Sequence, residues 1–519
     1  MKRHILFAIG VMTITSIAAQ ETYENANIAT KDLNGTARYV GMGGAMDALG
    51  ADLSTINNNP AGIGLFRHSQ AGISFGLVSQ QGGKEFANGN KTNTSLDQIG
   101  FVYTTQTRKN SFLNVAFNYH KNRNFNYILN AADNLSNASQ NKLSYQKLRN
   151  GLVYQFKSDG SIDTNKPYIS CNVLDALYTN NLFFAAGDGN IYNYAATDYT
   201  LNRAQKGYVG EYDFNISGNI RDRIYLGLTI GVYDVNYKHY GEYSERFTSN
   251  PENIAGLIVE DNREITGTGF DIKAGIIVRP IETSPFRLGL SIASPTWYSL
   301  NTSNYTVMTD GNARPYINES YDFKINTPWT FGLSLGHTIG NYLALGAGYE
   351  YAGYDNIDSR VNDGETYDWW TDSYYTNSYS DENMNRHTEK TLKGVSTFKL
   401  GVEYKATTAL ALRMGYNYVS PMYRSNGYKD GTIQSFGSYY SSATDYTNWD
   451  STNRFTCGIG YRMGKVSMDF AYQYSATNGK MTPFMSYIDN QNSSEDNIAN
   501  AVDVSNKRHQ LLFTLGYHF

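Results

Sequence analysis

Six short turns alternate along this sequence with seven long polar segments, and between them apolar side chains recur at every second position. At the C-terminal end Leu511, Phe513, Leu515 and Phe519 share one face, whereas Gly516 belongs to the other. This period of two indicates strands with two different faces. The turns lie at 107–110, 218–222, 280–284, 339–341, 405–408 and 463–465; the long segments are 80–94, 121–208, 241–265, 301–320, 355–391, 421–450 and 476–505.

Thirteen connections imply fourteen strands, with both ends of the strand array on the short-turn side. Short turns at one end, long loops at the other and strands of about ten residues are typical of bacterial outer-membrane barrels. A soluble sandwich has no reason to place every long loop at one end. We therefore predict an all-β fold, in which residues 67–519 form a 14-stranded antiparallel transmembrane β-barrel with external loops, notably 121–208, 355–391 and 421–450.

The first twenty residues predict export. Lys2 and Arg3 precede an apolar run over 5–14, and small residues follow at Ser16, Ala18 and Ala19. This order is that of a secretory signal peptide, here residues 1–20, removed from the mature protein. The predicted location is the bacterial outer membrane, with its lipid and lipopolysaccharide as partners. The formal net charge is −4, and the sequence has no basic patch, so nucleic acid is not expected as a partner.

The C-terminal residue adds a further expectation. Phe519 is a terminal aromatic residue, which resembles the signal by which outer-membrane barrels are recognised for assembly. We therefore expect the barrel assembly machinery to be a partner of the chain through Phe519.

The segment before the first predicted strand, residues 21–66, is rich in Gly, Ala and Asn. Eight strands are filled by their own side chains, whereas sixteen or more leave a water channel, so fourteen strands need a plug or form a pore. A compact segment of this length and composition is suitable for folding inside the lumen. We predict that residues 21–66 form an N-terminal lumenal hatch.

The run GADLSTINNNPAGIG at 50–64, with Asn59, Pro60, Ala61 and Gly62, resembles the hatch motif of the FadL/TodX family of outer-membrane hydrophobic-compound transporters. Segments 285–298 and 398–421 are similar to that family's strands as well. The resemblance implies passive transport of hydrophobic small molecules, of the long-chain fatty acid or aromatic hydrocarbon class, without enzymatic activity. Ligand would be captured outside, enter an apolar lumen pocket and leave when the hatch shifts; a static plug is the alternative.

One loop carries a candidate external capture patch. Within 121–208, an otherwise polar segment, the apolar side chains are Val173, Leu174, Leu177, Phe183 and Phe184 among others. Positions 173, 174 and 177 share a helical face, and exposed apolar patches usually mark binding surfaces. The alternative is a helix that packs against the other loops.

Charged residues on the polar strand faces provide a second set of candidates. Arg287 and Arg413 could bind a ligand carboxylate, and structural ion pairs are the alternative. The eight histidines are scattered without ligand spacing, so neither a metal site nor a cofactor is expected. His120 and His337 could ligate haem iron, but their spacing does not select this role.

Two other function classes remain open. A general diffusion porin for polar solutes is favoured by the hydrophilic lumen face. A surface adhesin is favoured by the Tyr-, Asn- and Ser-rich loops 355–391 and 421–450, and a haem-binding outer-membrane protein is the further alternative, for which His120 and His337 are the candidates. No Ser/His/acid grouping predicts a hydrolase.

Overall fold

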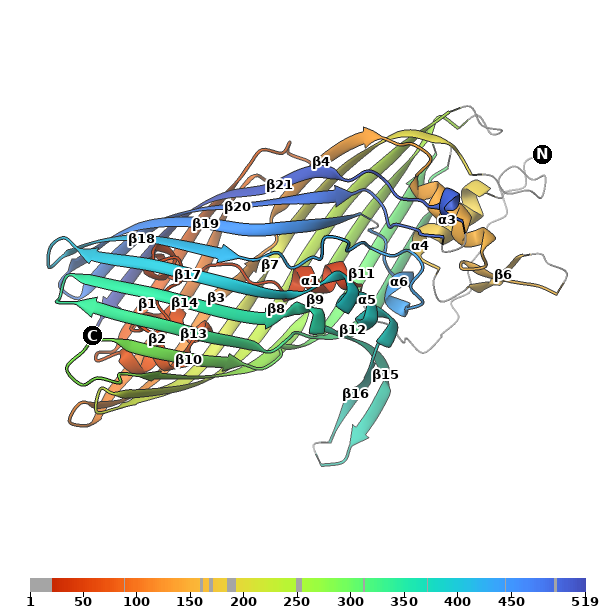
Figure 1. Cartoon of the computed structure of the whole chain (residues 1–519). Helices are drawn as coiled ribbons and strands as arrows, with labels where there is room; N and C mark the ends of the chain where they lie inside the picture. Colours follow the sequence, from red (N-terminus) through yellow and green to blue (C-terminus); the bar gives the residue numbers. More distant parts are fainter. Residues whose placement is uncertain are drawn as a thin grey trace.

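The computed structural model describes residues 21–87, 89–158, 162–167, 171–183, 193–248, 254–310, 313–370, 372–443, 445–489 and 492–519. They form a closed antiparallel β-barrel, with short connections at one end and larger loops at the other (Figure 1). The predicted fold class, a 14-stranded antiparallel transmembrane barrel, is confirmed. The predicted signal peptide, residues 1–20, lies outside the described residues.

Nineteen strand segments belong to one sheet. Four strands of the barrel are each made of two consecutive segments, because both segments pair along the same neighbouring strand positions: β3 with β4, β10 with β11, β12 with β13, and β14 with β15. The segment β16 pairs with β15 as a hairpin and lies beside the circuit of strands. The circuit is β1(Gln70–Gln81), β2(Thr92–Arg108), β3(Ser111–Asn124), β4(Tyr127–Asn134), β7(Ala196–Ile220), β8(Ile224–Phe247), β9(Gly256–Val278), β10(Arg287–Ala293), β11(Trp297–Thr309), β12(Tyr316–Asn326), β13(Thr330–Ile339), β14(Leu343–Gly353), β15(Asp358–Asp368), β17(Gly394–Lys405), β18(Leu410–Val419), β19(Tyr446–Met463), β20(Val466–Thr482) and β21(Val502–His518). Antiparallel pairing of β21 with β1 closes it.

All six predicted short turns are confirmed, as the connections β2–β3, β7–β8, β9–β10, β13–β14, β17–β18 and β19–β20. The predicted loop at 241–265 is wrong over most of its length, because β8 continues to Phe247 and β9 begins at Gly256. The same correction applies to 301–320, which β11 and β12 enter from both sides. There the outer face is mostly polar and the inner face is largely buried, so the apolar outer stripe ends although the backbone pairing continues.

The turn-proximal part of each strand has an apolar outer face. On β8, Leu226, Leu228 and Ile230 are 46–49% exposed, while the inward Thr229 is fully buried. The neighbouring strands repeat this pattern, with exposed Phe75, Phe101, Ile216, Ile272, Leu333, Leu400, Phe455 and Leu515. These side chains form a belt around the barrel that meets the lipid hydrocarbon, and we call it the lipid belt.

The opposite end carries the smaller elements. They are α3(Gln140–Arg149), β5(Tyr154–Phe156), β6(Ile162–Pro167), α4(Val173–Tyr178), η3(Thr179–Phe183), η4(Tyr354–Asn356), β16(Ser373–Ser380), α5(Glu382–Thr391), α6(Phe436–Tyr439) and η5(Ser493–Glu495). The hairpin β15–β16 projects away from the barrel axis and exposes Trp369 and Trp370 near its tip (Figure 1). Every helix within the described residues is too short or too polar to span a bilayer.

We expect Leu228→Arg in the middle of the lipid belt to lower the free energy of unfolding by about 2–4 kcal/mol, because it moves a charge into hydrocarbon. The matched variant is Ser303→Arg, on an outer face of β11 beyond the belt, with an expected cost of about 0–1 kcal/mol. Denaturant unfolding of the barrel in lipid vesicles measures both values. Equal losses for the two variants would contradict this position of the belt.

Candidate functional site

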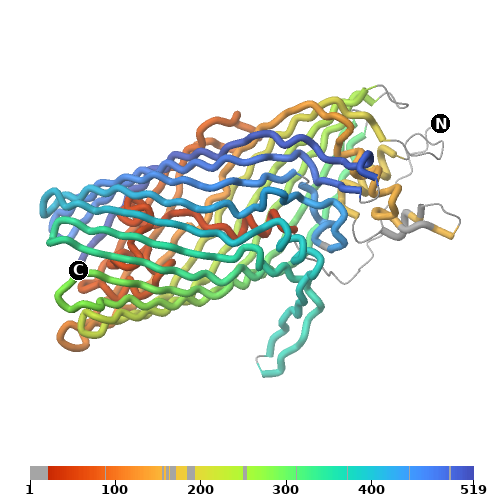
Figure 2. Tube along the Cα trace, viewed as in Figure 1, coloured from red at the N-terminus to blue at the C-terminus, as the bar shows by residue number. Residues whose placement is uncertain are grey.

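The N-terminal segment, residues 21–66, lies inside the barrel (Figure 2, red). It consists of α1(Thr22–Ala29), α2(Ala37–Gly41), η1(Leu53–Asn57) and η2(Pro60–Leu65), and most of its side chains are buried. The helix η2 contacts β7, β8 and β9, whereas α2 contacts β18, β19 and β20 on the other side of the circuit. A segment that contacts both sides fills the lumen between them.

Side-chain caps determine the local structure of this segment. Thr36 accepts a hydrogen bond from the Tyr39 amide at the start of α2, and Asp52 accepts one from the Ser54 amide at the start of η1. Such residues satisfy backbone donors that a helix start leaves free. The short helices are thereby defined without a long run of helix-forming residues.

The predicted hatch motif forms the capped start of η2. The Asn59 side chain accepts a hydrogen bond of 3.1 Å from the Ala61 amide, and Pro60 takes the first helical position, where no amide donor is needed. The Pro60 carbonyl accepts a hydrogen bond of 2.9 Å from Ser217 Oγ on β7. Gly62 is buried against Thr55, whose Oγ1 a Cβ there would contact at 2.5 Å. Asn59, Pro60 and Ala61 therefore lie against the barrel wall near the turn end, and Gly62 packs on η1 within the segment.

Glycines on the strands allow the backbone of the segment to approach the wall. A Cβ on Gly346 of β14 would overlap the Ala45 carbonyl oxygen, and one on Gly401 of β17 would overlap that of Met42. On β9, a Cβ on Gly275 would overlap the Asn59 side chain. The wall is thus shaped to the segment at this level, and we call these glycines the glycine seat.

The other end of the segment reaches the loops. Tyr23 on α1 stacks on Tyr423 with ring centroids 5.2 Å apart and contacts Tyr446 at 5.1 Å. Burial raises the pKa of the Tyr423 hydroxyl, which stays neutral in this environment. Lys429 in the same loop pairs with Glu21 at 3.3 Å. The segment therefore extends along the lumen from the loop end to the turn end.

His387 on α5 contributes to the same contact. Its Nε2 donates to the Tyr428 carbonyl at 2.9 Å, which leaves Nδ1 to accept from Thr22 Oγ1 at 2.8 Å. Burial lowers the pKa of the His387 imidazole, so the ring is neutral near pH 7. The external helix α5 is thereby bonded directly to the start of the N-terminal segment.

A cavity of about 290 Å³ lies between the N-terminal segment, the strand parts near the loop end and the loops. Its aromatic lining includes Tyr23, Phe125, Tyr127, Tyr237, Tyr446 and Trp449. Its charged lining includes Lys31, Asp32, Arg123, Lys399, Arg454 and Arg508. The resemblance implies an apolar pocket; the cavity is instead lined by aromatic, charged and uncharged polar side chains, because the inner strand faces carry polar and ionisable residues.

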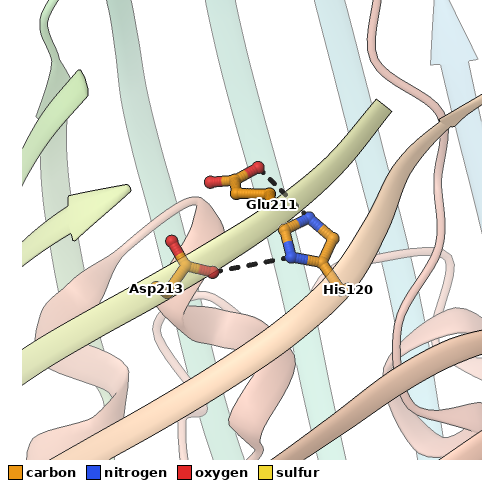
Figure 3. Close-up of side chains that lie close together, drawn as sticks. All are labelled: His120, Glu211 and Asp213. Atoms are coloured by element: carbon orange, nitrogen blue, oxygen red, sulfur yellow. Dashed lines mark ion pairs between the residues drawn. The ribbon is translucent and has the colours of Figure 1, made fainter. Parts of the chain in front are cut away.

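His120, Glu211 and Asp213 lie close together on β3 and β7 (Figure 3). The His120 nitrogens are 3.3 Å from a Glu211 oxygen and 3.5 Å from an Asp213 oxygen. The Lys273 ammonium contacts the same two carboxylates, at 3.1 Å for Asp213, and lies 3.6 Å from Asp271. Because this ammonium supplies the positive charge that a metal ion would bring, we interpret the group as a buried ion network that joins β3, β7 and β9.

The two predicted lumen arginines have different surroundings. Arg413 donates to Glu403 at 2.6 Å and to Asp469 at 2.5 Å, and Glu403 also pairs with Arg38 on α2 at 2.9 Å. Arg287 donates to the Leu49 carbonyl at 3.1 Å. Arg413 thus belongs to an ion-pair network that holds α2 on the wall, and Arg287 holds the N-terminal segment through a neutral acceptor.

The predicted external capture patch needs a correction. Val173, Leu174, Leu177 and Phe183 are only 1–2% exposed, and the last three pack in a cluster with Tyr178. Phe184 lies outside the described residues. The apolar side chains close a small core of the loop region, so packing against the other loops, the alternative left open above, is what the structure contains.

The sequence analysis did not predict the group of charged side chains around Asp32. Arg123, Arg454 and Arg508 come from β3, β19 and β21, and Asp32 comes from the N-terminal segment. Strand alternation could have identified Arg454 and Arg508 as inward-facing. Their approach to each other depends on barrel closure, for which the sequence has no local signal.

No family model and no curated protein matches the chain. Among solved structures, the chain is similar to the toluene transporter TbuX of Ralstonia pickettii (12% identity, TM-score 0.47), with 94% of this chain and 99% of that chain covered. It is also similar to a FadL homologue of Pseudomonas aeruginosa (12%, 0.49; 97% and 99% covered) and to the toluene transporter TodX of Pseudomonas putida (10%, 0.47; 94% and 99% covered). These names include those of the family that residues 50–64 resemble, and at such identities the likeness concerns the fold alone.

We expect Glu403→Gln to lower the free energy of unfolding by about 3–5 kcal/mol, because it leaves two guanidinium groups without their shared carboxylate. The matched variant Glu264→Gln removes an exposed pair with Lys238 and should cost less than about 1 kcal/mol. Equilibrium unfolding in guanidinium chloride provides both numbers. A loss below that of Glu264→Gln would contradict a structural role for the network.

Proposed function

We propose that this chain is an outer-membrane channel through which hydrophobic small molecules cross by diffusion, with residues 21–66 acting as a hatch. The observation that carries the proposal is the aromatic side of the cavity, which lies directly above a lumen filled by the N-terminal segment. The N-terminal segment lies between this cavity and the turn end. A solute that enters from the loop end would therefore be held in the cavity.

The energetics favour this use of the cavity. Burial of apolar surface contributes about 25 cal/mol per Å², and the aromatic rings around Tyr23 and Trp449 offer such surface. A cavity of about 290 Å³ is near the lower end of ligand pockets, which hold about 300–1,000 Å³. A small hydrophobic molecule or part of a longer chain would therefore be retained until a path opens.

Exit requires the N-terminal segment to shift, because it fills the barrel between the cavity and the turn end. Part of its seat is backbone packed on glycines, as at Gly346 and Gly401, where the wall has no side chain that would interlock with the segment. Gly43 and Gly50 have φ values of +63° and +62°, so the segment bends at positions where glycine is favoured. This combination of close packing and permissive bends supports a movable segment.

The experiment compares uptake of a labelled long-chain fatty acid and a labelled small sugar in cells without their own transporters. Wild type should admit the fatty acid and exclude the sugar. Deletion of 21–66 should admit both solutes, and Pro60→Ala, which frees the start of η2, should change the rate of fatty-acid uptake. Free passage of sugar through the wild type would replace the proposal with a general porin, which the charged side of the cavity favours.

Two glycines on β14 provide a matched pair of variants. Gly346→Ala should displace residues 42–46 and let sugar leak, because its Cβ overlaps the Ala45 carbonyl. Gly348→Ala, two residues along the same face, would meet the flexible Lys399 side chain at 3.4 Å and should leave uptake unchanged. If both variants exclude sugar as tightly as the wild type, the glycine seat does not close the lumen. Uptake of neither solute by the wild type would point to the loops as the functional part.

A further inference from the structure

The hairpin β15–β16 meets the barrel at its base. Strand β12 pairs with β15 over 358–360, and the Asn362 side chain donates to the Asp322 carbonyl at 3.0 Å just beyond that pairing. Among the described residues from 363 to 375, all but Asp368 are exposed. The hairpin projects away from the barrel axis at the loop end (Figure 1), which is the external end in barrels of this kind. Its outer part is therefore open to a partner outside the cell.

The outer part of the hairpin carries large aromatic side chains. Trp369 and Trp370 are 70% and 80% exposed, and their rings pack on each other with centroids 4.2 Å apart. Tyr374 is also exposed and packs on Tyr367 at 5.1 Å, and the exposed Tyr375 follows it. We call these five side chains the aromatic tip. Trp and Tyr are the residues that supply most binding energy at protein interfaces, and contiguous exposed apolar patches usually mark interaction surfaces.

Carboxylates accompany the aromatic tip. Residues 361–380 contain four acidic residues and no Lys, Arg or His; the four are Asp363, Glu365, Asp368 and Asp372. Asp372 accepts a hydrogen bond from the Tyr367 hydroxyl, and Asp368 accepts one of 2.9 Å from the Trp370 amide. Two of the carboxylates are thus held beside the rings, and the outer part of the hairpin is negatively charged.

Basic side chains occur at the base of the hairpin, where they have local partners. Arg360 pairs with Asp358 at 2.8 Å, and Lys324 on β12 donates to the Thr376 carbonyl at 2.6 Å. These two cations connect the base to the barrel. The negative charge further out is therefore available to attract a cation from outside.

This combination of rings and carboxylates selects among possible occupants. An anionic lipid surface or a second copy of the same acidic hairpin would be repelled. A Lys ammonium or Arg guanidinium is attracted twice, by the carboxylates and by the faces of the Trp rings, on which a cation binds favourably. Exposed ion pairs alone contribute little, so the rings would supply the contact area and the carboxylates the preference for positive charge.

We propose that the aromatic tip of β15–β16 is a docking surface for a Lys- and Arg-rich segment of a partner protein outside the cell. The cationic side chains of that segment lie on the faces of Trp369 and Trp370, next to Asp368 and Glu365. The docking needs neither the lumen nor the N-terminal segment, so it is independent of the proposed transport.

The test is binding of fluorescent peptides to the folded barrel in nanodiscs of zwitterionic lipid, measured by anisotropy. Three peptides of equal length are compared: one rich in Lys and Arg, one with these residues replaced by Gln, and one with Glu instead. The basic peptide should bind at least about tenfold more tightly than the Gln peptide, and added salt should reduce this difference. Equal affinities for the basic and the Gln peptide would overturn the proposal.

The variant Trp369→Ala/Trp370→Ala leaves the charge of the hairpin unchanged. It should weaken binding of the basic peptide at least about tenfold, because the cations lose the rings. Tyr316→Ala, which removes another exposed aromatic ring, on β12, is the matched control and should bind as the wild type. Heat-modified migration in gel electrophoresis verifies that each variant is folded. Undiminished binding by the Trp variant would contradict the assignment to the tip.

A second pair of variants tests the carboxylates. Asp363→Asn/Glu365→Gln should weaken binding of the basic peptide at low salt and have little effect at high salt. Glu264→Gln/Asp503→Asn removes the same charge from two exposed pairs away from the hairpin and should leave binding unchanged. Equal losses in both variants would mean attraction by the net charge of the protein and would overturn a specific surface.

Other occupants give distinct results. If maltohexaose, a neutral oligosaccharide, binds more tightly than the basic peptide and is lost in the Trp variant, the tip is a glycan surface. If iodide fails to quench the two tryptophans in nanodiscs without peptide, the tip is a lipid anchor. Either result overturns the proposal. Fatty-acid uptake should be the same in all these variants as in the wild type, so failure of docking and failure of transport are seen separately.

Discussion

Everything else in the molecule depends on barrel closure. In hydrocarbon, each backbone N–H and C=O must find its partner within the protein, and a sheet achieves this only when it has no free edge. The pairing of β1 with β21 over residues 70–81 and 507–518 removes that edge. Closure also fixes a lumen of definite width, which residues 21–66 occupy.

Closure sets the conditions for the inner surface. The inward residues of the strands include glycines, where the N-terminal segment approaches, and ionisable side chains, which form networks. Glu403 joins the barrel to the N-terminal segment in such a network, because it pairs with Arg413 on β18 and with Arg38 on α2. Around Asp32, by contrast, the positive charges outnumber the negative ones.

Local sequence patterns predicted the parts of the fold that depend on local physics. The alternation of apolar and polar residues, with short turns between, gave the number and direction of the strands, because lipid on one side and lumen on the other impose that pattern. It failed at residues 241–265, where the outer faces of β8 and β9 lie beyond the lipid belt and carry polar side chains such as Glu242 and Glu264, although the inner faces stay buried.

The candidate site was less accessible to sequence reasoning. Asn59 and Pro60 were identified by resemblance, and their burial against the wall agrees with a role in the lumen without testing motion. Leu174 and Leu177 have the spacing of an exposed helical face but pack in a core of loops, since an apolar stripe looks the same whether water or another loop covers it. Arg454 and Arg508 come together with Asp32 from strands and a segment far apart in sequence, so no local spacing relates them.

The course of the N-terminal segment along the lumen has a consequence for biogenesis. Residues made first, such as Tyr23 and Met42, rest on residues made hundreds of positions later, such as Tyr446 and Gly401. Those contacts cannot form until nearly the whole chain has been translocated, and long-range contacts of this kind slow folding. With loops over one end and narrow turns at the other, the segment has to be enclosed while the wall is still open. The barrel strands therefore close around the N-terminal segment of the same chain.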